Sequence, residues 1–397
     1  MEKPKIRFKG YQEDWEQRKF DEVFDCTIPN NTLSRAELNY ESGSVRNIHY
    51  GDILIKYGSV VDVQNDEIPF ATGKSSDDFK GALLQDGDII IADTAEDETT
   101  GKACEIGNSQ GLDVVSGLHT MVCRPRNKMA LGYLGYYLNS DAYHHQLLPL
   151  MQGIKVLSLS RTNVQKTMVC YPKSKTEQQL IADCFRNLDN LITLHQRKCE
   201  EMKTLKKYML QKMFPQNGQS VPQIRFSGFT EDWEQRKLSD VVDSVDTGKS
   251  RFDKEGLSGE YPILGSTSVI GYDDEYDYEG DFILTARVGA NAGSLYRHAG
   301  KVKISDNTVF IQASQNIEFL YQLLIQFDIK KLSFGTGQPL VKASELKSLE
   351  LMMPSDMKEQ MRIGVYFKNL DSLITLHQQK CDELRNIKKF MLQNMFI

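Results

Sequence analysis

The sequence predicts an α+β protein with two similar mixed α/β domains and two long antiparallel coiled-coil helices, arranged as a pseudo-two-fold internal repeat. Two observations carry this prediction. A segment near the N-terminus recurs with an offset of 218 residues, and a longer segment with a helical pattern recurs with an offset of 182. The stretches between these segments do not match one another. The chain therefore has the order A, variable, B, A, variable, B.

The two repeats are well defined. Repeat A covers residues 4–25 and 222–243, which are identical at 14 of 22 positions. Repeat B covers residues 176–214 and 358–396, which are identical at 23 of 39 positions. Because the offset falls from 218 to 182, the first variable segment is longer than the second by 218 − 182 = 36 residues. The simplest interpretation is one fold that carries two different surfaces.

Repeat B has the pattern of a long helix with a coiled-coil seam. Its apolar positions alternate in spacings of four and three residues, as in helices that pack on each other. Only Gly364 interrupts the pattern, and Pro172 and Pro354 precede the two helices as start signals. The residues expected to pack in the seam are Ile181, Phe185, Leu188, Ile192 and His195 in the first copy, and Ile363, Phe367, Leu370, Ile374 and His377 in the second.

His195 and His377 are polar residues in this otherwise apolar seam. A polar seam residue can fix the register of a coiled coil, and this is the preferred interpretation. The alternative is a metal or catalytic role. No carboxylate or second histidine stands at a ligand spacing beside either of them.

The variable segments have the pattern of strands and turns. Short apolar runs, several of them after Gly-Asp pairs, predict strands at residues 53–55, 89–92, 120–123, 282–284 and 308–311. Helical patterns near residues 131–148 and 316–332 interrupt these strands. The expected domains are 1–173 (first domain, variable part 27–172), 174–216 (first helix), 217–354 (linker and second domain, variable part 244–354) and 355–397 (second helix).

Composition predicts a cytoplasmic globular protein with no membrane partner. No apolar run approaches the about 18–20 residues of a membrane helix, and the N-terminus does not have the pattern of a signal peptide. The seven cysteines form no CxxC pair, which argues against a structural zinc site and against a disulfide framework.

No group of residues in the sequence indicates catalysis. Thr-Gly-Lys-Ser occurs at 72–75 and 247–250, but the earlier glycine of a phosphate-binding loop is missing in both, so both are interpreted as turns. The acidic run at 93–98 could hold a metal ion, although a solvated surface loop is the preferred interpretation. HExxH, GxSxG and the Asx-Pro-Pro-aromatic motif are absent. We therefore expect a binding protein with no catalytic and no metal-ligating residue.

Several of these features together resemble the specificity (S) subunit of type I restriction–modification systems. They are the Trp-Glu-Gln-Arg-Lys segments at 15–19 and 233–237, the Glu-Gln pairs at 177–178 and 359–360, the Asn-Leu-Asp-x-Leu-Ile segments at 187–192 and 369–374, and the helix endings at 206–214 and 388–396. The resemblance covers the whole chain. No single one of these motifs is specific, but their arrangement is.

The resemblance implies a function. The variable segments would be target-recognition domains, each reading one half of a bipartite, asymmetric target in double-stranded DNA. The helices would act as a spacer and dock two methyltransferase (M) subunits, which restriction (R) subunits join. The chain itself would be no enzyme and would bind no cofactor, because S-adenosylmethionine, ATP and Mg²⁺ belong to the partner subunits.

The net charge of −6 has two interpretations. It argues against a DNA-binding protein that acts alone, because a polyanion is bound mainly by basic groups. Alternatively, partner subunits supply the phosphate contacts. Two other classes of function stay open: a coiled-coil scaffold that binds other proteins or ligands, and an enzyme whose site is assembled from unrecognised residues.

Base contacts require donors and acceptors on exposed loops. Arg287 is the preferred candidate, because it follows a predicted strand and precedes a Gly-rich loop that could approach DNA closely. For every candidate a solvated surface side chain is the alternative, and His119 also fits a buried, hydrogen-bonded histidine. The candidates are Lys56, Tyr57, Lys102, His119 and Lys155 in the first domain, and Arg287, Asn291, Arg297, Asn307, Gln338 and Lys342 in the second.

Overall fold

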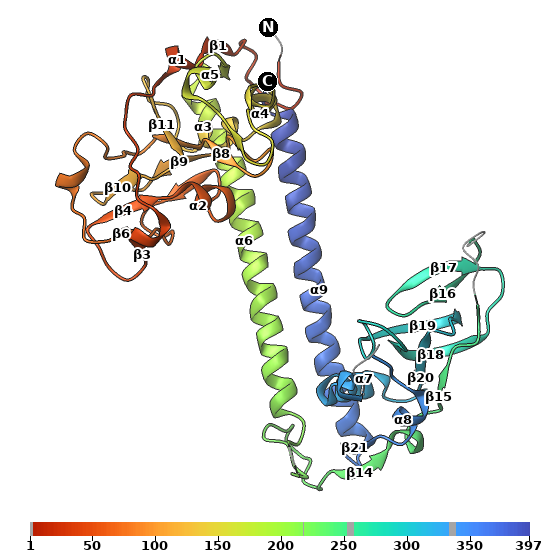
Figure 1. Cartoon of the computed structure of the whole chain (residues 1–397). Helices are drawn as coiled ribbons and strands as arrows, with labels where there is room; N and C mark the ends of the chain where they lie inside the picture. Colours follow the sequence, from red (N-terminus) through yellow and green to blue (C-terminus); the bar gives the residue numbers. More distant parts are fainter. Residues whose placement is uncertain (1–2, 217, 252–257, 333–338) are drawn as a thin grey trace. The chain divides into compact units, whose positions relative to one another are not determined.

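The computed structural model describes residues 3–216, 218–251, 258–332 and 339–397, and the chain divides into two compact units (Figure 1). Unit 1 contains residues 1–194 and 380–397, and unit 2 contains residues 195–379. Each unit combines β-sheets, short helices and halves of two long helices, α6 (Lys175–Lys212) and α9 (Met357–Asn394). This confirms the predicted α+β class with two mixed α/β domains and two long helices.

Unit 1 contains two larger sheets, both mixed. The first has the order β2-β11-β7-β9-β5, in which only the β5–β9 pair is parallel. Its strands are β2 (Phe24–Asp25), β11 (Thr120–Pro125), β7 (Ile89–Ala92), β9 (Ala103–Gly107) and β5 (Val60–Asp62). The second has the order β10-β4-β6-β3, with β10 (Asp113–Ser116), β4 (Val45–Ile48), β6 (Phe70–Ala71) and β3 (Leu38–Asn39).

Short helices and two-stranded ladders complete unit 1. The α-helices are α1 (Phe20–Val23), α2 (Tyr50–Ile55), α3 (Tyr133–Leu138), α4 (Asp141–Leu147) and α5 (Arg161–Val164). The 3-10 helices are η1 (Arg35–Glu37), η2 (Ser76–Phe79) and η3 (Leu148–Leu150). The ladders join β1 (Glu16–Lys19) to β13 (Met168–Tyr171), and β8 (Thr94–Ala95) to β12 (Leu157–Ser158).

Unit 2 is built on one six-stranded sheet, with the order β15-β20-β18-β19-β16-β17. Its strands are β15 (Ser244–Thr247), β20 (Thr308–Gln312), β18 (Tyr278–Ala286), β19 (Leu295–Ile304), β16 (Tyr261–Leu264) and β17 (Val269–Asp273). The helices are η4 (Leu238–Asp240), α7 (Ile317–Phe327), η5 (Ile329–Leu332) and α8 (Ala343–Lys347). A separate ladder joins β14 (Glu234–Lys237) to β21 (Glu350–Met353).

The two copies of repeats A and B make the same contacts in each unit. We call this shared part, a strand ladder and an ion pair beside the start of a long helix, the base of the unit. Each Glu-Gln-Arg-Lys segment forms a strand that pairs with the strand just before a long helix, as β1 with β13 and β14 with β21. In each copy an arginine of repeat A also forms an ion pair with a buried glutamate. The Arg7 Nε–Glu177 Oε1 distance is 2.6 Å, and the equivalent Arg225–Glu359 distance is 2.7 Å. The glutamine of each Glu-Gln pair bonds the proline carbonyl that precedes its helix.

The two long helices run antiparallel within each unit, as predicted. In unit 1, Lys388 pairs with Asp189 and the Cys381 thiol contacts the Ile192 carbonyl. In unit 2, Lys206 pairs with Asp371 at 2.6 Å and the Cys199 thiol contacts the Ile374 carbonyl. These contacts are equivalent under the repeat. The predicted seam residues Ile192 and Leu370 are buried, while Leu188 and Ile374 are half-buried.

The ends of the seam pack into domain cores. Ile181 and Phe185 lie in the core of unit 1, and Ile363 and Phe367 lie in the core of unit 2. Unit 1 also receives Phe396 from the end of α9, whose ring lies 5.6 Å from Phe185. In unit 2, the ring of Phe214, which follows α6, lies 5.9 Å from Phe367.

The two seam histidines contact each other directly. His195 Nδ1 and His377 Nδ1 are 2.9 Å apart in unit 2, and both side chains are half-buried. The contact requires one ring to donate and the other to accept, which matches a polar seam position. Within the described ranges, no group of three or more His, Cys, Asp or Glu side chains converges to hold a metal ion.

One predicted strand is wrong. Residues 53–55 lie in helix α2, because His49 caps the helix start and the Gly51-Asp52 pair forms its first turn. The other predicted runs are strands β7, β11, β18 and β20, and the two helical patterns correspond to α3, α4 and α7 with η5. No helix in the described part of the chain combines the length and the apolar character needed to cross a bilayer.

Candidate nucleic-acid interface

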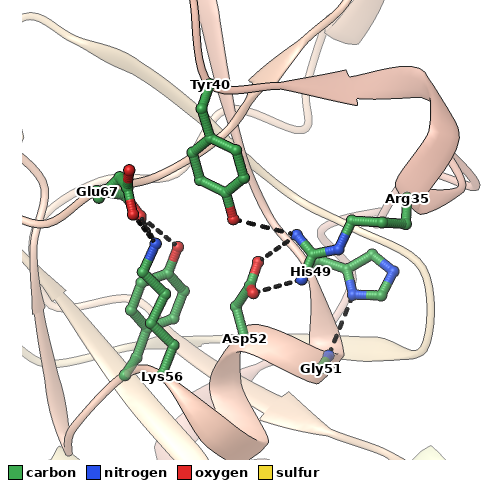
Figure 2. Close-up of polar contacts among 8 residues, drawn as sticks. Arg35, Tyr40, His49, Gly51, Asp52, Lys56 and Glu67 are labelled. Atoms are coloured by element: carbon green, nitrogen blue, oxygen red, sulfur yellow. Dashed lines mark hydrogen bonds and ion pairs between the residues drawn. The ribbon is translucent and has the colours of Figure 1, made fainter.

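In unit 1, polar side chains gather around the start of helix α2 (Figure 2). Strand β4 leads into His49, whose Nδ1 accepts a hydrogen bond from the backbone N–H of Gly51 at 3.1 Å. This bond caps the helix and fixes its first turn. Asp52 lies in that turn and is buried.

Arg35 forms a two-pronged ion pair with Asp52. Its Nη1 donates to Oδ2 at 2.8 Å and its Nη2 donates to Oδ1. Nη1 also donates to the Tyr40 hydroxyl at 3.4 Å. The Arg35 side chain is 48% exposed, although its partner is buried. Hydrogen bonding to Asp52 raises the pKa of the guanidinium, so Arg35 stays charged and is held in one orientation.

The turn that carries Arg35 is itself fixed. Ser34 and Glu37 form a capping box around η1, in which the Glu37 carboxylate accepts from both the backbone N–H and the hydroxyl of Ser34. Arg35 is the first residue of η1. Both ends of the Arg35–Asp52 pair are therefore anchored in capped turns.

Lys56, one of the candidates for DNA contact, lies in the same cluster. Its Nζ donates to the backbone carbonyl and to the carboxylate of Glu67, both at 2.7 Å, and lies 4.8 Å from the centre of the Tyr40 ring. The side chain is 32% exposed. Lys56 is thus partly accessible and held in place.

His119 lies next to this cluster and is exposed. Its backbone has φ of +55°, which is uncommon for a residue other than glycine and recurs at functional sites. Its ring meets the Tyr50 ring edge-on at 5.3 Å, and its Nδ1 is 3.6 Å from the Asp93 carboxylate. Burial, and then the nearby charges of Arg35 and His119, lower the pKa of His49. The Tyr50 ring also lies 4.6 Å from the His49 ring, so His119 and Tyr50 adjoin the start of α2.

Tyr57 and Lys102, two further candidates, are engaged inside the first domain. Tyr57 is 4% exposed and lies in the core of the first domain. Lys102 Nζ donates to the carbonyls of Leu54 and Tyr57 at 3.0 and 3.1 Å, which closes the end of α2. Burial lowers the pKa of this amine. Both placements favour a structural role over DNA contact. Lys155, by contrast, is exposed in the bend before β12.

In unit 2, three loop segments meet at the end of strand β18. The backbone N–H of Arg287 donates to the Asn307 carbonyl at 2.9 Å, and the Arg287 carbonyl accepts from Val341 at 2.8 Å, next to Lys342. Arg287, Asn307 and Lys342 are all exposed. Asn291 is also exposed, in the Gly-rich loop that a bridge between Ala286 and Ala292 closes. The structure thus brings four of the predicted residues together.

Arg297, a further candidate of unit 2, is engaged by other side chains. Arg297 forms an ion pair with Glu318, and its guanidinium lies 4.4 Å from the centre of the Tyr321 ring. This placement ties β19 to α7 and favours a structural role. Gln338 lies outside the described residues.

Sequence reasoning missed Arg35, Asp52 and Tyr50. The Ser34-x-x-Glu37 spacing is a readable capping signal, and it would have placed Arg35 in a turn. The pairing of Arg35 with Asp52 had no such signal, because the two residues are brought together only by tertiary folding.

Comparison with known proteins identifies similar chains. A family model described as the type I restriction modification DNA specificity domain matches residues 12–204 and again residues 230–386. The putative type I restriction enzyme MjaX specificity subunit of Methanocaldococcus jannaschii is 22% identical over 411 residues, which cover 95% of this chain and 91% of that protein. The MjaVIII specificity subunit of the same organism is 26% identical over 248 residues, covering 54% of this chain and 57% of the relative.

A solved structure is similar over the full length. The S subunit of a type I restriction–modification system from M. genitalium superposes with a TM-score of 0.70, covering 100% of this chain and 99% of the other. The sequence identity is 15%, so this likeness concerns the fold.

Proposed function

The chain belongs to the family of type I restriction modification DNA specificity subunits, and from this premise we propose that it reads a bipartite, asymmetric DNA target, one half-site for each unit. The observation that carries the proposal is a contrast within the chain. The base of each unit repeats the same ladder and the same buried ion pair. The variable segments above these bases differ in length and in sheet topology.

A protein with a repeated base and two different variable segments is suited to recognise two half-sites of different sequence. Exposed polar side chains on loops can contact base edges, and each unit offers such a set, around α2 in unit 1 and at the end of β18 in unit 2. We assign the long helices the role of a spacer that sets the gap between half-sites. Two heads on one frame can contact major-groove segments about one helical turn, or ~34 Å, apart.

The helices also offer two equivalent docking surfaces, which we assign to two methyltransferase subunits. Leu191, Leu205 and Tyr208 on α6 are exposed. Their equivalents at the offset of 182, which are Leu373, Ile387 and Phe390 on α9, are exposed too. Leu205 and Tyr208 are three residues apart and share one face of α6, so they form a short apolar row of the kind that marks an interaction surface. Because Ile387 and Phe390 repeat this row on α9, it supports two copies of one partner, which restriction subunits then join.

Catalysis is assigned to the partner subunits. S-adenosylmethionine, ATP and Mg²⁺ are expected there, and this chain is assigned no cofactor. The net charge of −6 supports the same division of work, because basic partner surfaces can then neutralise the DNA phosphates.

A selection experiment tests the reading of a bipartite target. The full chain, bound to its methyltransferase subunit, is mixed with random DNA duplexes, and the retained duplexes are sequenced. We expect two fixed, unlike half-sites with a gap of constant length. Insertion of one heptad at equivalent positions of α6 and α9 should change the gap and leave both half-sites as they were. Retention without any common motif would instead support the scaffold alternative.

A second experiment tests the docking surfaces. Tyr208→Lys or Phe390→Lys should each remove one methyltransferase subunit from the complex, and the double variant should remove both, as read by native mass spectrometry. Thr193→Lys and Thr375→Lys, at exposed positions outside the apolar row, are the matched controls. Two subunits still bound to the double variant would contradict the assignment.

A further inference from the structure

We infer that Arg35, held by Asp52, reads a guanine in the half-site contacted by unit 1. The inference rests on the proposed function and names the residue and the base for that half-site. It begins from the hydrogen bonds that the guanidinium already makes.

The Arg35 guanidinium keeps one edge free. A guanidinium carries five N–H donors in a fixed plane. Asp52 accepts one N–H from Nη1 and one from Nη2, and Tyr40 accepts the second N–H of Nη1. The N–H of Nε and the second N–H of Nη2 remain, and they lie on the same edge. No residue in the described ranges accepts a hydrogen bond from Nε, and the side chain is 48% exposed.

A free edge with two parallel donors is complementary to one base. In the major groove guanine presents two neighbouring acceptors, N7 and O6. Adenine presents an acceptor beside a donor, cytosine presents a donor, and thymine presents one acceptor beside a methyl group. Only guanine can accept both N–H groups of the free edge, so this geometry selects guanine over the other three bases.

Asp52 makes Arg35 more suited to a base than to a phosphate. The carboxylate neutralises the guanidinium, which weakens the long-range attraction to the DNA backbone but leaves the donors in place. It also fixes the side chain in one orientation before DNA arrives, so less rotamer freedom is lost on binding. The Asp52 carboxylate is buried and sits in a capped helix turn, so it is a firm support.

The position of Arg35 fits a determinant of one half-site. It lies in the variable segment, where the two units differ in sequence and length, and not in a repeat that both units share. Tyr50, the first residue of α2, and the exposed His119 lie beside His49, so further polar side chains surround the helix turn that carries Asp52. Arg18, by contrast, is in repeat A and has an equivalent in Arg236, so it cannot distinguish the half-sites.

The test uses the full chain with its methyltransferase subunit and duplexes randomised in both half-sites. We expect the unchanged chain to select guanine at one position that depends on Arg35. In Arg35→Ala the preference for guanine there should fall by about 5- to 140-fold, the range for one lost two-pronged base contact. Every other position, including the whole second half-site, should keep its preference. That retention also shows that the variant is folded and assembled.

Two further variants separate reading from folding. Asp52→Asn removes the support and should weaken the preference at the same position, by less than Arg35→Ala. Arg18→Ala removes another exposed, ion-paired arginine of unit 1 and should leave all positions unchanged.

The outcomes are distinct. A profile in Arg35→Ala that keeps its guanine preference, or one that weakens equally at all positions of both half-sites, overturns the inference while leaving the proposed function intact. If the unchanged chain selects no two-part motif, the proposed function fails and the inference fails with it.

Discussion

Units 1 and 2 share the same base, which repeats A and B form, but they differ in the part that the variable segment forms, here called the head. In both, a tryptophan of repeat A and a phenylalanine of repeat B form part of an aromatic socket: Trp15 with Phe185, and Trp233 with Phe367. The rest of each socket comes from the variable segment. In unit 1 it is Tyr133 and Tyr137, and in unit 2 it is Phe319.

This difference shows how the same repeated segments can support two variable segments with different surfaces. Each socket is filled by the phenylalanine at the end of a long helix, Phe396 in unit 1 and Phe214 in unit 2. The helix that begins in one unit therefore ends in the core of the other. The duplicated contacts hold each helix end in place. The variable segment of each unit has to fit the repeats where it contributes aromatic residues to the socket. The remaining surface of each head is then free to differ.

The largest expected effect comes from removing the phenylalanine ring that fills an aromatic socket. Phe396→Ala and Phe214→Ala should each lower the free energy of unfolding by about 3–5 kcal/mol, because each removes a fully enclosed ring. Phe396 should cost more, since it contacts Trp15, Tyr133, Tyr137 and Phe185. Denaturant unfolding gives the total, and hydrogen exchange by mass spectrometry assigns the loss to a unit.

Phe390→Ala is the control for the socket variants, because Phe390 is 56% exposed in the last turns of α9, shortly before Phe396. It should have little effect on the isolated chain. Equal loss of protection in both units after either socket variant would show that the two cores do not respond separately.

The buried ion pairs give the next effect. Arg7→Ala and Arg225→Ala should each lower the free energy of unfolding by about 3 kcal/mol, because each leaves a buried carboxylate without its partner. Arg225→Ala should cost more. In unit 1 Trp15 Nε1 also donates to Glu177 at 3.4 Å, whereas the buried Trp233 Nε1 has no partner in the described structure. A larger loss for Arg7→Ala in a thermal melt would contradict this ranking.

Much of this architecture is predictable from sequence, for physical reasons. The seam residues and the helix starts lie in or beside the repeats, where two copies of one pattern reinforce each other. The pattern at 53–55 predicts a strand, because three apolar residues after Gly-Asp fit a strand as well as a helix. The cap that decides between them is a histidine, His49, which is not a strong capping signal.

The candidate site was less predictable than the frame. Exposed loop residues such as Arg287 and Asn307 are recognisable by type and by the strand they flank. Tyr57 and Lys102 have suitable chemistry, but burial and backbone contacts engage them elsewhere, and sequence does not report burial at single positions. The Arg35–Asp52 pair depends on two turns meeting in space, which local patterns do not encode.

Unit 1 should also have a pH dependence of its own, through Glu105. Burial raises the pKa of this carboxyl from 4.5 to about 7, although the backbone N–H of Gly135 donates to it at 2.9 Å. The folded state therefore holds the proton more tightly than the unfolded state. The stability of unit 1 should fall as pH rises from about 4.5 to 7, by about 3 kcal/mol, and stay level above that.

Glu105→Gln keeps an acceptor for Gly135 and removes the titration. It should flatten this pH dependence and protect unit 1 above pH 7, with no change in unit 2. Hydrogen exchange at pH 5 and pH 8, corrected for the intrinsic exchange rates, measures both units in one sample. An unchanged slope in Glu105→Gln would assign the pH dependence to other groups.

The smallest effect is expected where the two copies of repeat B meet at equivalent residues. His195→Leu leaves His377 Nδ1 half-buried without its partner, so it should lower the free energy of unfolding by about 1 kcal/mol. His377→Leu should do the same, because the positions are equivalent. The double variant should be as stable as the unchanged chain or more stable, since an apolar pair suits the seam. A double-mutant cycle in denaturant measures the coupling. If the two single losses simply add in the double variant, the contact between the rings contributes nothing, and the histidines act only through their separate surroundings.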